Sequence, residues 1–111
     1  MRMTVHRHED KIALTVLGDI DDYTYPLFAH ELEMLDRIAT QNLLINLEGC
    51  PFLNFQCIRL MVDTHRRFHQ AGRRVEIQLG SENSTVRELM KAMALTMETV
   101  APNLDETRPG N

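Results

Sequence analysis

The stretch Phe52-Leu53-Asn54-Phe55-Gln56-Cys57-Ile58-Arg59-Leu60 decides the fold of this chain. Apolar residues alternate over residues 42–47, just before it, which predicts a strand with one buried face. Asn54 has the short polar side chain that caps helix N-termini. Apolar residues then recur at helical spacing from Ile58 to Phe68, and Ala71-Gly72 provides a stop. The stretch is therefore the turn that joins a buried strand to an amphipathic helix.

The same signals place the other elements around this turn. Alternating apolar residues predict strands near residues 2–7, 12–17 and 75–79. Asp22, Thr24 and Pro26 are helix-start signals for a helix over residues 25–40. A capping box at Thr85-Val86-Arg87-Glu88 predicts a third helix that buries several methionines. The first two strands are so close in sequence that they must pair as an antiparallel hairpin.

The two faces of the predicted strands differ in polarity. The apolar face collects Met3, Val5, Ile12, Leu14, Val16, Leu43, Ile45, Leu47, Val75, Ile77 and Leu79. The other face carries Thr4, His6, Ala13, Thr15, Asn46, Glu76 and Gln78. A sheet with helices on both faces would show continuous apolar runs instead. The pattern predicts a two-layer α/β domain, with a mixed and mostly parallel sheet, an antiparallel first strand and helices on one face.

Length and composition limit the classes of protein. A chain of 111 residues is enough for one domain, expected over residues 1–100, with a flexible tail over 101–111. The net charge of −4 argues against general nucleic-acid binding. No apolar run is long enough for a membrane span, and residues 1–7 lack a signal-peptide core, so we expect a cytoplasmic protein. Cys50 and Cys57 are expected as reduced thiols.

Short motifs, in order, resemble one known family. They are Gly18-Asp19-Ile20-Asp21, Leu44-Ile45-Asn46-Leu47, Phe52-Leu53-Asn54, Ala71-Gly72 and Ser84-Thr85-Val86-Arg87-Glu88-Leu89. Their order and spacing resemble the STAS domain, the fold of the anti-sigma factor antagonists, over residues 3–100. The resemblance implies a binding protein without enzymatic activity or cofactor, which captures an anti-sigma factor and so frees a sigma factor. In that family, phosphorylation of a serine in the strand-to-helix turn disfavours the capture.

This chain departs from the family at the turn itself. Gln56 stands where the family has the phosphorylated serine, and it is neutral and has no hydroxyl. Cys57 and Arg59 replace two glycines of the family motif. We therefore expect either a domain locked in its binding-competent state or one that lies outside a kinase circuit. The resemblance places the partner-binding surface at Asp21, Asn54, Phe55, Gln56, Cys57 and Arg59.

Several alternatives stay open at this point. Phe55 is either an exposed aromatic anchor for the partner or a partly buried residue of the first helical turn. Some STAS domains bind the ATPase of a membrane transporter, which gives an alternative function. A third possibility is an enzyme that uses Cys57 as a thiolate at a helix N-terminus. A homodimer through the polar sheet face or the edge of the first strand is also possible.

Two clusters of polar residues have ordinary explanations. His65 and His69 have metal-ligand spacing on one helix, but no third ligand is evident, so solvated histidines are the default interpretation and no metal is expected. Arg66, Arg67, Arg73 and Arg74 form a basic corner at the end of the same helix. That corner is either a patch for acidic partners or a solvated face that suits the helix dipole.

Overall fold

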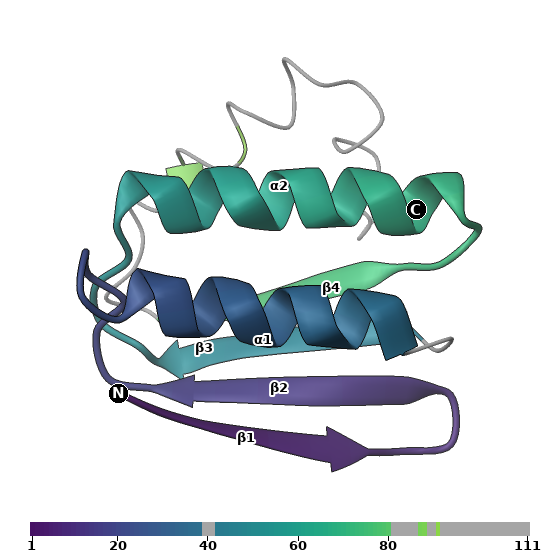
Figure 1. Cartoon of the computed structure of the whole chain (residues 1–111), viewed down its shortest axis with the longest axis horizontal. Coiled ribbons are helices and arrows are strands. Elements are labelled where there is room, and N and C mark those ends of the chain that lie inside the picture. The colour runs from purple at the N-terminus through teal and green to yellow at the C-terminus, as the bar shows by residue number, and fades with distance from the viewer. Residues whose placement is uncertain (39–41, 81–86, 89–90, 92–111) are drawn as a thin grey trace.

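Four strands and two helices make up the described part of the chain, residues 1–38, 42–80, 87, 88 and 91 of a computed structural model (Figure 1). In chain order they are β1 (Arg2–Arg7), β2 (Lys11–Leu17), α1 (Tyr25–Ile38), β3 (Asn42–Gly49), α2 (Phe55–Gln70) and β4 (Val75–Leu79). The sequence predicted each of these to within a few residues. The predicted third helix and the tail over 101–111 lie outside the described residues, except for Arg87, Glu88 and Lys91.

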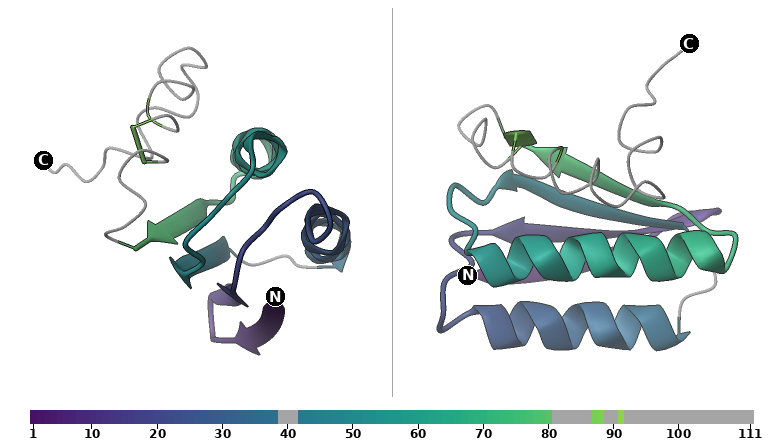
Figure 2. Two further views of the ribbon diagram at one scale, coloured as in Figure 1. Left: turned by 90° about the vertical axis from the view of Figure 1, so that its left-hand side faces the viewer. Right: turned by 90° about the horizontal axis from the view of Figure 1, so that it is seen from above.

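The strands form one mixed sheet in the order β1-β2-β3-β4. β1 pairs antiparallel with β2, whereas β2 with β3 and β3 with β4 are parallel. Parallel neighbours need a crossover, and α1 and α2 provide the two crossovers. Both helices lie on the same side of the sheet (Figure 2), as the polarity of the strands predicted. The fold class is therefore confirmed: a two-layer α/β domain with an antiparallel first strand.

The core lies between the sheet and the two helices. Its fully buried large side chains are Phe28, Phe68, Ile12, Leu14, Ile20, Leu32, Leu43, Ile45, Leu47, Met61 and Val16. The predicted apolar face matches this core, with Met3, Ile77 and Leu79 partly buried against it, except at Val5 of β1, which is 42% exposed. The reason is that β1 is an edge strand, while the crossovers carry the helices over β2, β3 and β4. On the polar face Ala13 is buried, because His6 of β1 and Leu44 of β3 flank it in register.

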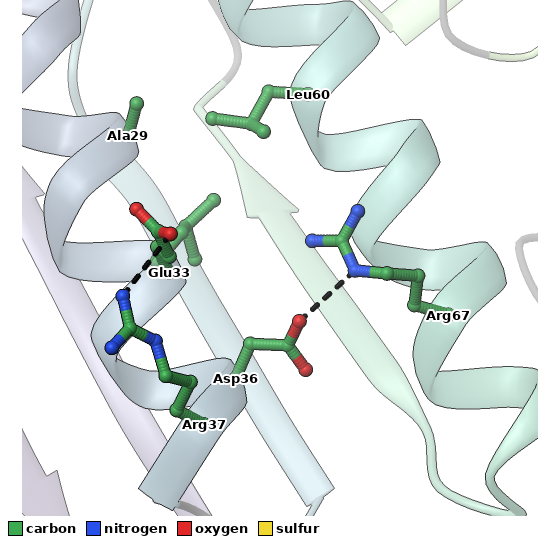
Figure 3. Close-up of a pocket in the computed structure, with 7 residues that line it drawn as sticks. Ala29, Glu33, Asp36, Arg37, Leu60 and Arg67 are labelled. Carbon is green, nitrogen blue, oxygen red and sulfur yellow. Dashed lines mark hydrogen bonds and ion pairs between the residues drawn. The ribbon is translucent and has the colours of Figure 1, made fainter.

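Salt bridges hold α1 against α2 on the outside of the helix layer. Asp36 of α1 accepts from Arg67 Nε at 2.9 Å and lies 3.7 Å from Arg73 Nη2. Arg67 of α2 and Arg73, which follows α2, thus pair with α1, although the Arg67 side chain stays 48% exposed. Between the helices lies an open hollow of about 490 Å³ (Figure 3), lined by Ala29, Leu32, Glu33, Asp36, Arg37, Leu60 and Arg67. Neither described helix is long and apolar enough to cross a membrane.

Candidate functional site

Two loops meet at the carboxyl ends of the parallel strands. One loop follows β2 and the other follows β3, and backbone hydrogen bonds join them. Ile20 N donates to Phe52 O at 2.9 Å, and Asn54 N donates to Ile20 O at 2.9 Å. Ile20 and Leu53 also form an isolated parallel bridge. The loops therefore form a single continuous edge, which brings residues 18–24 beside the start of α2.

Asp21 is occupied in organising the first of these loops. Its Oδ1 accepts hydrogen bonds from the backbone N–H groups of Tyr23 and Thr24, both at 3.0 Å. In return, Asp21 N donates to Thr24 Oγ1 at 2.9 Å. The hydrogen bond from the Thr24 backbone is the main reason that the pKa of Asp21 lies below its ordinary value. Asp21 thus shapes the loop at the start of α1, and its carboxylate is already hydrogen-bonded within the chain.

Asn54 caps α2, as the sequence predicted. Its backbone is extended, with φ −80° and ψ 168°, and its Oδ1 accepts from Cys57 N at 2.9 Å. Its Nδ2 donates to Asp22 Oδ1 at 3.2 Å. One side chain therefore satisfies a helix N-terminus and also connects the two loops.

Replacing Asn54 by alanine should lower the free energy of unfolding by about 1 to 2 kcal/mol, because the N-cap hydrogen bond is lost. Urea denaturation measures this loss. The control is Gln56→Ala, which also shortens an exposed polar side chain at the same end of α2. Equal losses for the two variants would contradict the capping role of Asn54.

Three exposed aromatic side chains gather along this edge. Tyr23 is 90% exposed, Phe55 55% and Phe52 50%. The chain has only two tyrosines and four phenylalanines, and the other three aromatic residues are buried or pack against the core. All of the exposed aromatic side chains therefore belong to this surface, which we call the aromatic edge. Of the two interpretations of Phe55, the structure shows the exposed one.

The other predicted site residues divide into exposed and buried. Gln56 and Arg59 are exposed on the first turns of α2. Cys57 is fully buried in the core, so the prediction that it alters the contact surface is wrong. The cause is its place on the core-facing side of α2, one turn before Met61. Tyr23 and Phe52 were not predicted, since they lie in loops where periodicity carries no signal.

Both cysteines are poor nucleophiles in this environment. Burial raises the pKa of the Cys57 thiol strongly, and it raises that of Cys50 to about 11. Cys50 Sγ also lies 3.3 Å from Phe52 O and donates to it. The thiolate that a catalytic Cys57 would need is therefore disfavoured.

His65 differs from its expected state. It is only 2% exposed, so the default interpretation of a solvated histidine is wrong for this residue, although His69 is exposed. The two rings stack with centroids 6.4 Å apart. Neither ring nitrogen of His65 has a hydrogen-bond partner in the described part of the chain. Within residues 1–38, 42–80, 87, 88 and 91, no three His, Cys, Asp or Glu side chains group to hold a metal ion.

The burial of His65 predicts a pH-dependent stability. Burial first, and then the charge on His69, lower the pKa of His65 from its ordinary 6.5. The unfolded chain therefore binds a proton that the folded chain resists. Stability should be full above about pH 6.5 and should fall below it, by at most about 1.4 kcal/mol per pH unit.

Urea denaturation at pH 7.5 and at pH 5.5 measures this effect. The variant His65→Leu should remove most of the pH dependence between these values, whereas His69→Gln should keep most of it. An unchanged pH dependence in His65→Leu would contradict this assignment.

Solved structures with known roles share this architecture. An anti-sigma factor antagonist from Mycobacterium paratuberculosis superposes with a TM-score of 0.68 at 17% identity, over 94% of each chain. The unphosphorylated form of the anti-sigma factor antagonist SpoIIAA gives a TM-score of 0.59 at 8% identity, over 79% of this chain and 97% of that one. The protein Mglu gives 0.56 at 26% identity, over 67% of this chain but only 18% of its own.

These similarities define the class of fold. The chain has the STAS-like fold of the anti-sigma factor antagonists, as the sequence motifs predicted. No protein-family model and no curated protein sequence matches it. At 8% and 17% identity, the two antagonists establish only the fold of this chain. The feature of this chain that bears on function is the aromatic edge.

Proposed function

We propose that this protein is a non-enzymatic regulator that captures an anti-sigma factor, or a related regulatory protein, in the cytoplasm. The contact residues are Tyr23, Phe52 and Phe55, with Gln56 and Arg59 beside them. Asp21 and Asn54 position these residues through internal hydrogen bonds. The observation that carries the proposal is the gathering of every exposed aromatic side chain on one edge of the molecule.

Physical chemistry supports a binding role for that edge. Large aromatic side chains bury much apolar area with few rotatable bonds, which is why tyrosine is frequent among the residues that dominate interface energies. Leaving such side chains in water on a small domain forgoes the stabilisation that burial would give. The core holds Phe28 and Phe68, so the fold is able to bury such rings. A partner that covers Tyr23, Phe52 and Phe55 would recover the lost burial.

Gln56 determines how such binding is regulated. It is exposed at the start of α2, near the centre of the proposed contact surface. A phosphate there would bring nearly two negative charges into the interface and would disfavour binding. Because glutamine cannot accept a phosphate, binding is not switched at this position.

This absence of a switch gives a direct expectation. After incubation with ATP and an anti-sigma kinase, residues 54–59 should carry no phosphate, as measured by intact mass and peptide mapping. The variant Gln56→Ser is the matched comparison, and we expect it to be modified poorly, because Phe55 and Arg59 still alter the docking surface. A phosphate on residues 54–59 of the wild type would refute the absence of a switch at this turn.

The test of the function is affinity capture from cells, with the partner identified by mass spectrometry. The wild-type protein should retain an anti-sigma factor, and a Tyr23→Ser, Phe55→Ser double variant should lose it. Gln70→Ser is the control, since Gln70 is exposed and lies at the other end of α2 from Phe55. Capture of a transporter ATPase instead would support the alternative function. Equal capture by both variants would refute the role of the aromatic edge.

A further inference from the structure

β1 leaves one edge of the sheet open. It pairs only with β2 among the described strands, and β2 to β4 continue the sheet on the other side. Figures 1 and 2 show β1 at the border of the molecule, with α1 and α2 over the other strands. The outer backbone N–H and C=O groups of β1 are therefore available to pair with a further strand.

The adjacent flank of α1 carries three exposed apolar side chains around the partly buried Glu31. Leu27 is 58% exposed, Met34 39% and Ile38 59%. Leu27 and Met34 are seven residues apart, and Met34 and Ile38 are four apart, so all three lie on one side of the helix. Ala29 and Asp36 line the hollow towards α2, so this flank faces the opposite way, towards β1. Together with Val5 on the helix side of β1, the three residues form an apolar surface that we call the β1 step.

We propose that the β1 step binds an extended segment of another protein, which pairs with β1 as a fifth strand. Strand addition at an open sheet edge is a common mode of peptide recognition, in which backbone hydrogen bonds give affinity and alternate side chains give specificity. Alternate side chains of the incoming segment would point towards Val5 and the flank of α1. These side chains are therefore apolar.

The charges of β1 define the other face of the incoming segment. β1 contains Arg2, His6 and Arg7 and no acidic residue. Arg7 pairs with Ile12 and so lies on the helix side, whereas Arg2 and His6 pair with Leu17 and Ala13 and lie on the sheet face away from the helices. Side chains of a bound segment that lie beside them are therefore acidic. The bound segment therefore alternates between apolar and acidic residues. The exception is the position nearest the partly buried Glu31, where a side chain that donates a hydrogen bond fits.

The same charges disfavour a second copy of this chain. In an antiparallel β1–β1 pair, Met3 and Val5 stay on the helix side only if odd-numbered residues pair with odd-numbered residues and even-numbered residues with even-numbered ones. In the register centred on Thr4, Arg2 faces His6 twice. In the register centred on Val5, Arg2 faces His8 twice. Neither register places a carboxylate opposite Arg2, so a second copy of the chain supplies no ion pair there. An acidic segment does supply one, so the occupant is a different chain of opposite charge.

A synthetic peptide of alternating valine and glutamate, ten residues long, is the probe. We expect it to shift the backbone amide signals of β1 and of the outer flank of α1 in a titration of the full-length protein. A matched peptide of alternating valine and lysine should bind roughly tenfold more weakly. Met34→Glu should lower the affinity for the glutamate peptide at least about fivefold, because it places a charge against the apolar face of the peptide.

The control for Met34→Glu has to add a negative charge away from the step. Gln70→Glu is a better control than His30→Glu, because His30 lies four residues before Met34 and borders the step. Gln70 is exposed at the end of α2, which lies on the far side of α1 from β1 (Figure 1), so Gln70→Glu adds the same charge outside the step and should bind the peptide almost as well as the wild type. Three results would overturn the proposal: no shift in β1 at about 1 mM peptide, equal binding of the two peptides, or a dimer through β1 in sedimentation. Both substitutions replace exposed residues, and amide spectra confirm that each variant is folded.

Discussion

Phe68→Ala should lower the free energy of unfolding by about 3 to 5 kcal/mol, the usual range for removing a fully buried aromatic ring. The Phe68 side chain has no exposed surface in the core under α2. The Arg73 guanidinium lies 4.0 Å from the centre of its ring, and Arg73 N donates to Phe68 O at 2.8 Å. Since small domains are stable by only about 5 to 15 kcal/mol, this variant should be close to unfolding at room temperature.

Chemical denaturation measures the effect, with Phe68→Leu as the control. Leucine keeps most of the buried volume and should cost clearly less, because the remaining cavity is smaller. A loss below about 1 kcal/mol in Phe68→Ala would mean that the ring is not packed as the structure shows.

Phe55→Ala, on the same helix, should weaken partner binding while leaving the free energy of unfolding nearly unchanged. The Phe55 ring is 55% exposed, so its removal should change the free energy of unfolding by about 1 kcal/mol or less. If the ring anchors a partner, its loss should lower the affinity by about 2 kcal/mol, or roughly thirtyfold. The measurement is calorimetric titration of the captured partner with the wild type and the variant.

Gln56→Ala is the matched control for that titration, since it truncates the neighbouring exposed side chain without removing an aromatic ring. We expect a smaller change in affinity from it. If Phe55→Ala left the affinity unchanged but lowered the melting temperature, the ring would be a packing residue of the fold and not an anchor.

Local sequence patterns predicted the architecture because each element signals itself. The alternation in β2, β3 and β4 reports the one-sided burial of the sheet, and Asn54 reports the start of α2. The end of α2 was equally clear, because Gly72 has φ +77°, a conformation that glycine adopts without strain. Such features depend on neighbours in sequence, so no knowledge of the whole fold was needed.

The errors on α2 arose from assigning residues by chemical type. Cys57 and His65 share the spacing of Met61 and Phe68, so periodicity could have placed both in the core. The family motif suggested a surface role for Cys57, and the polarity of imidazole suggested one for His65. The position on the helix determined burial in both cases.

The aromatic edge depends on tertiary structure and was only half predictable. Phe55 followed from its place beside the cap, but Tyr23 and Phe52 lie in loops that come together through Ile20, Phe52 and Asn54. Residues thirty positions apart in the chain meet there, and no local pattern reports such pairing. The exposure of Val5 also depends on tertiary structure, because it arises where the helices leave the edge strand uncovered.

The backbone hydrogen bonds between the two loops also determine how a complex would form. Because Ile20 is fixed to Phe52 and Asn54 before any partner arrives, the loops lose little conformational entropy on association. The rate of complex formation should then depend on the orientation of two rigid surfaces and not on a slow rearrangement. The change in heat capacity should reflect only the surface buried at the interface, without a contribution from coupled folding.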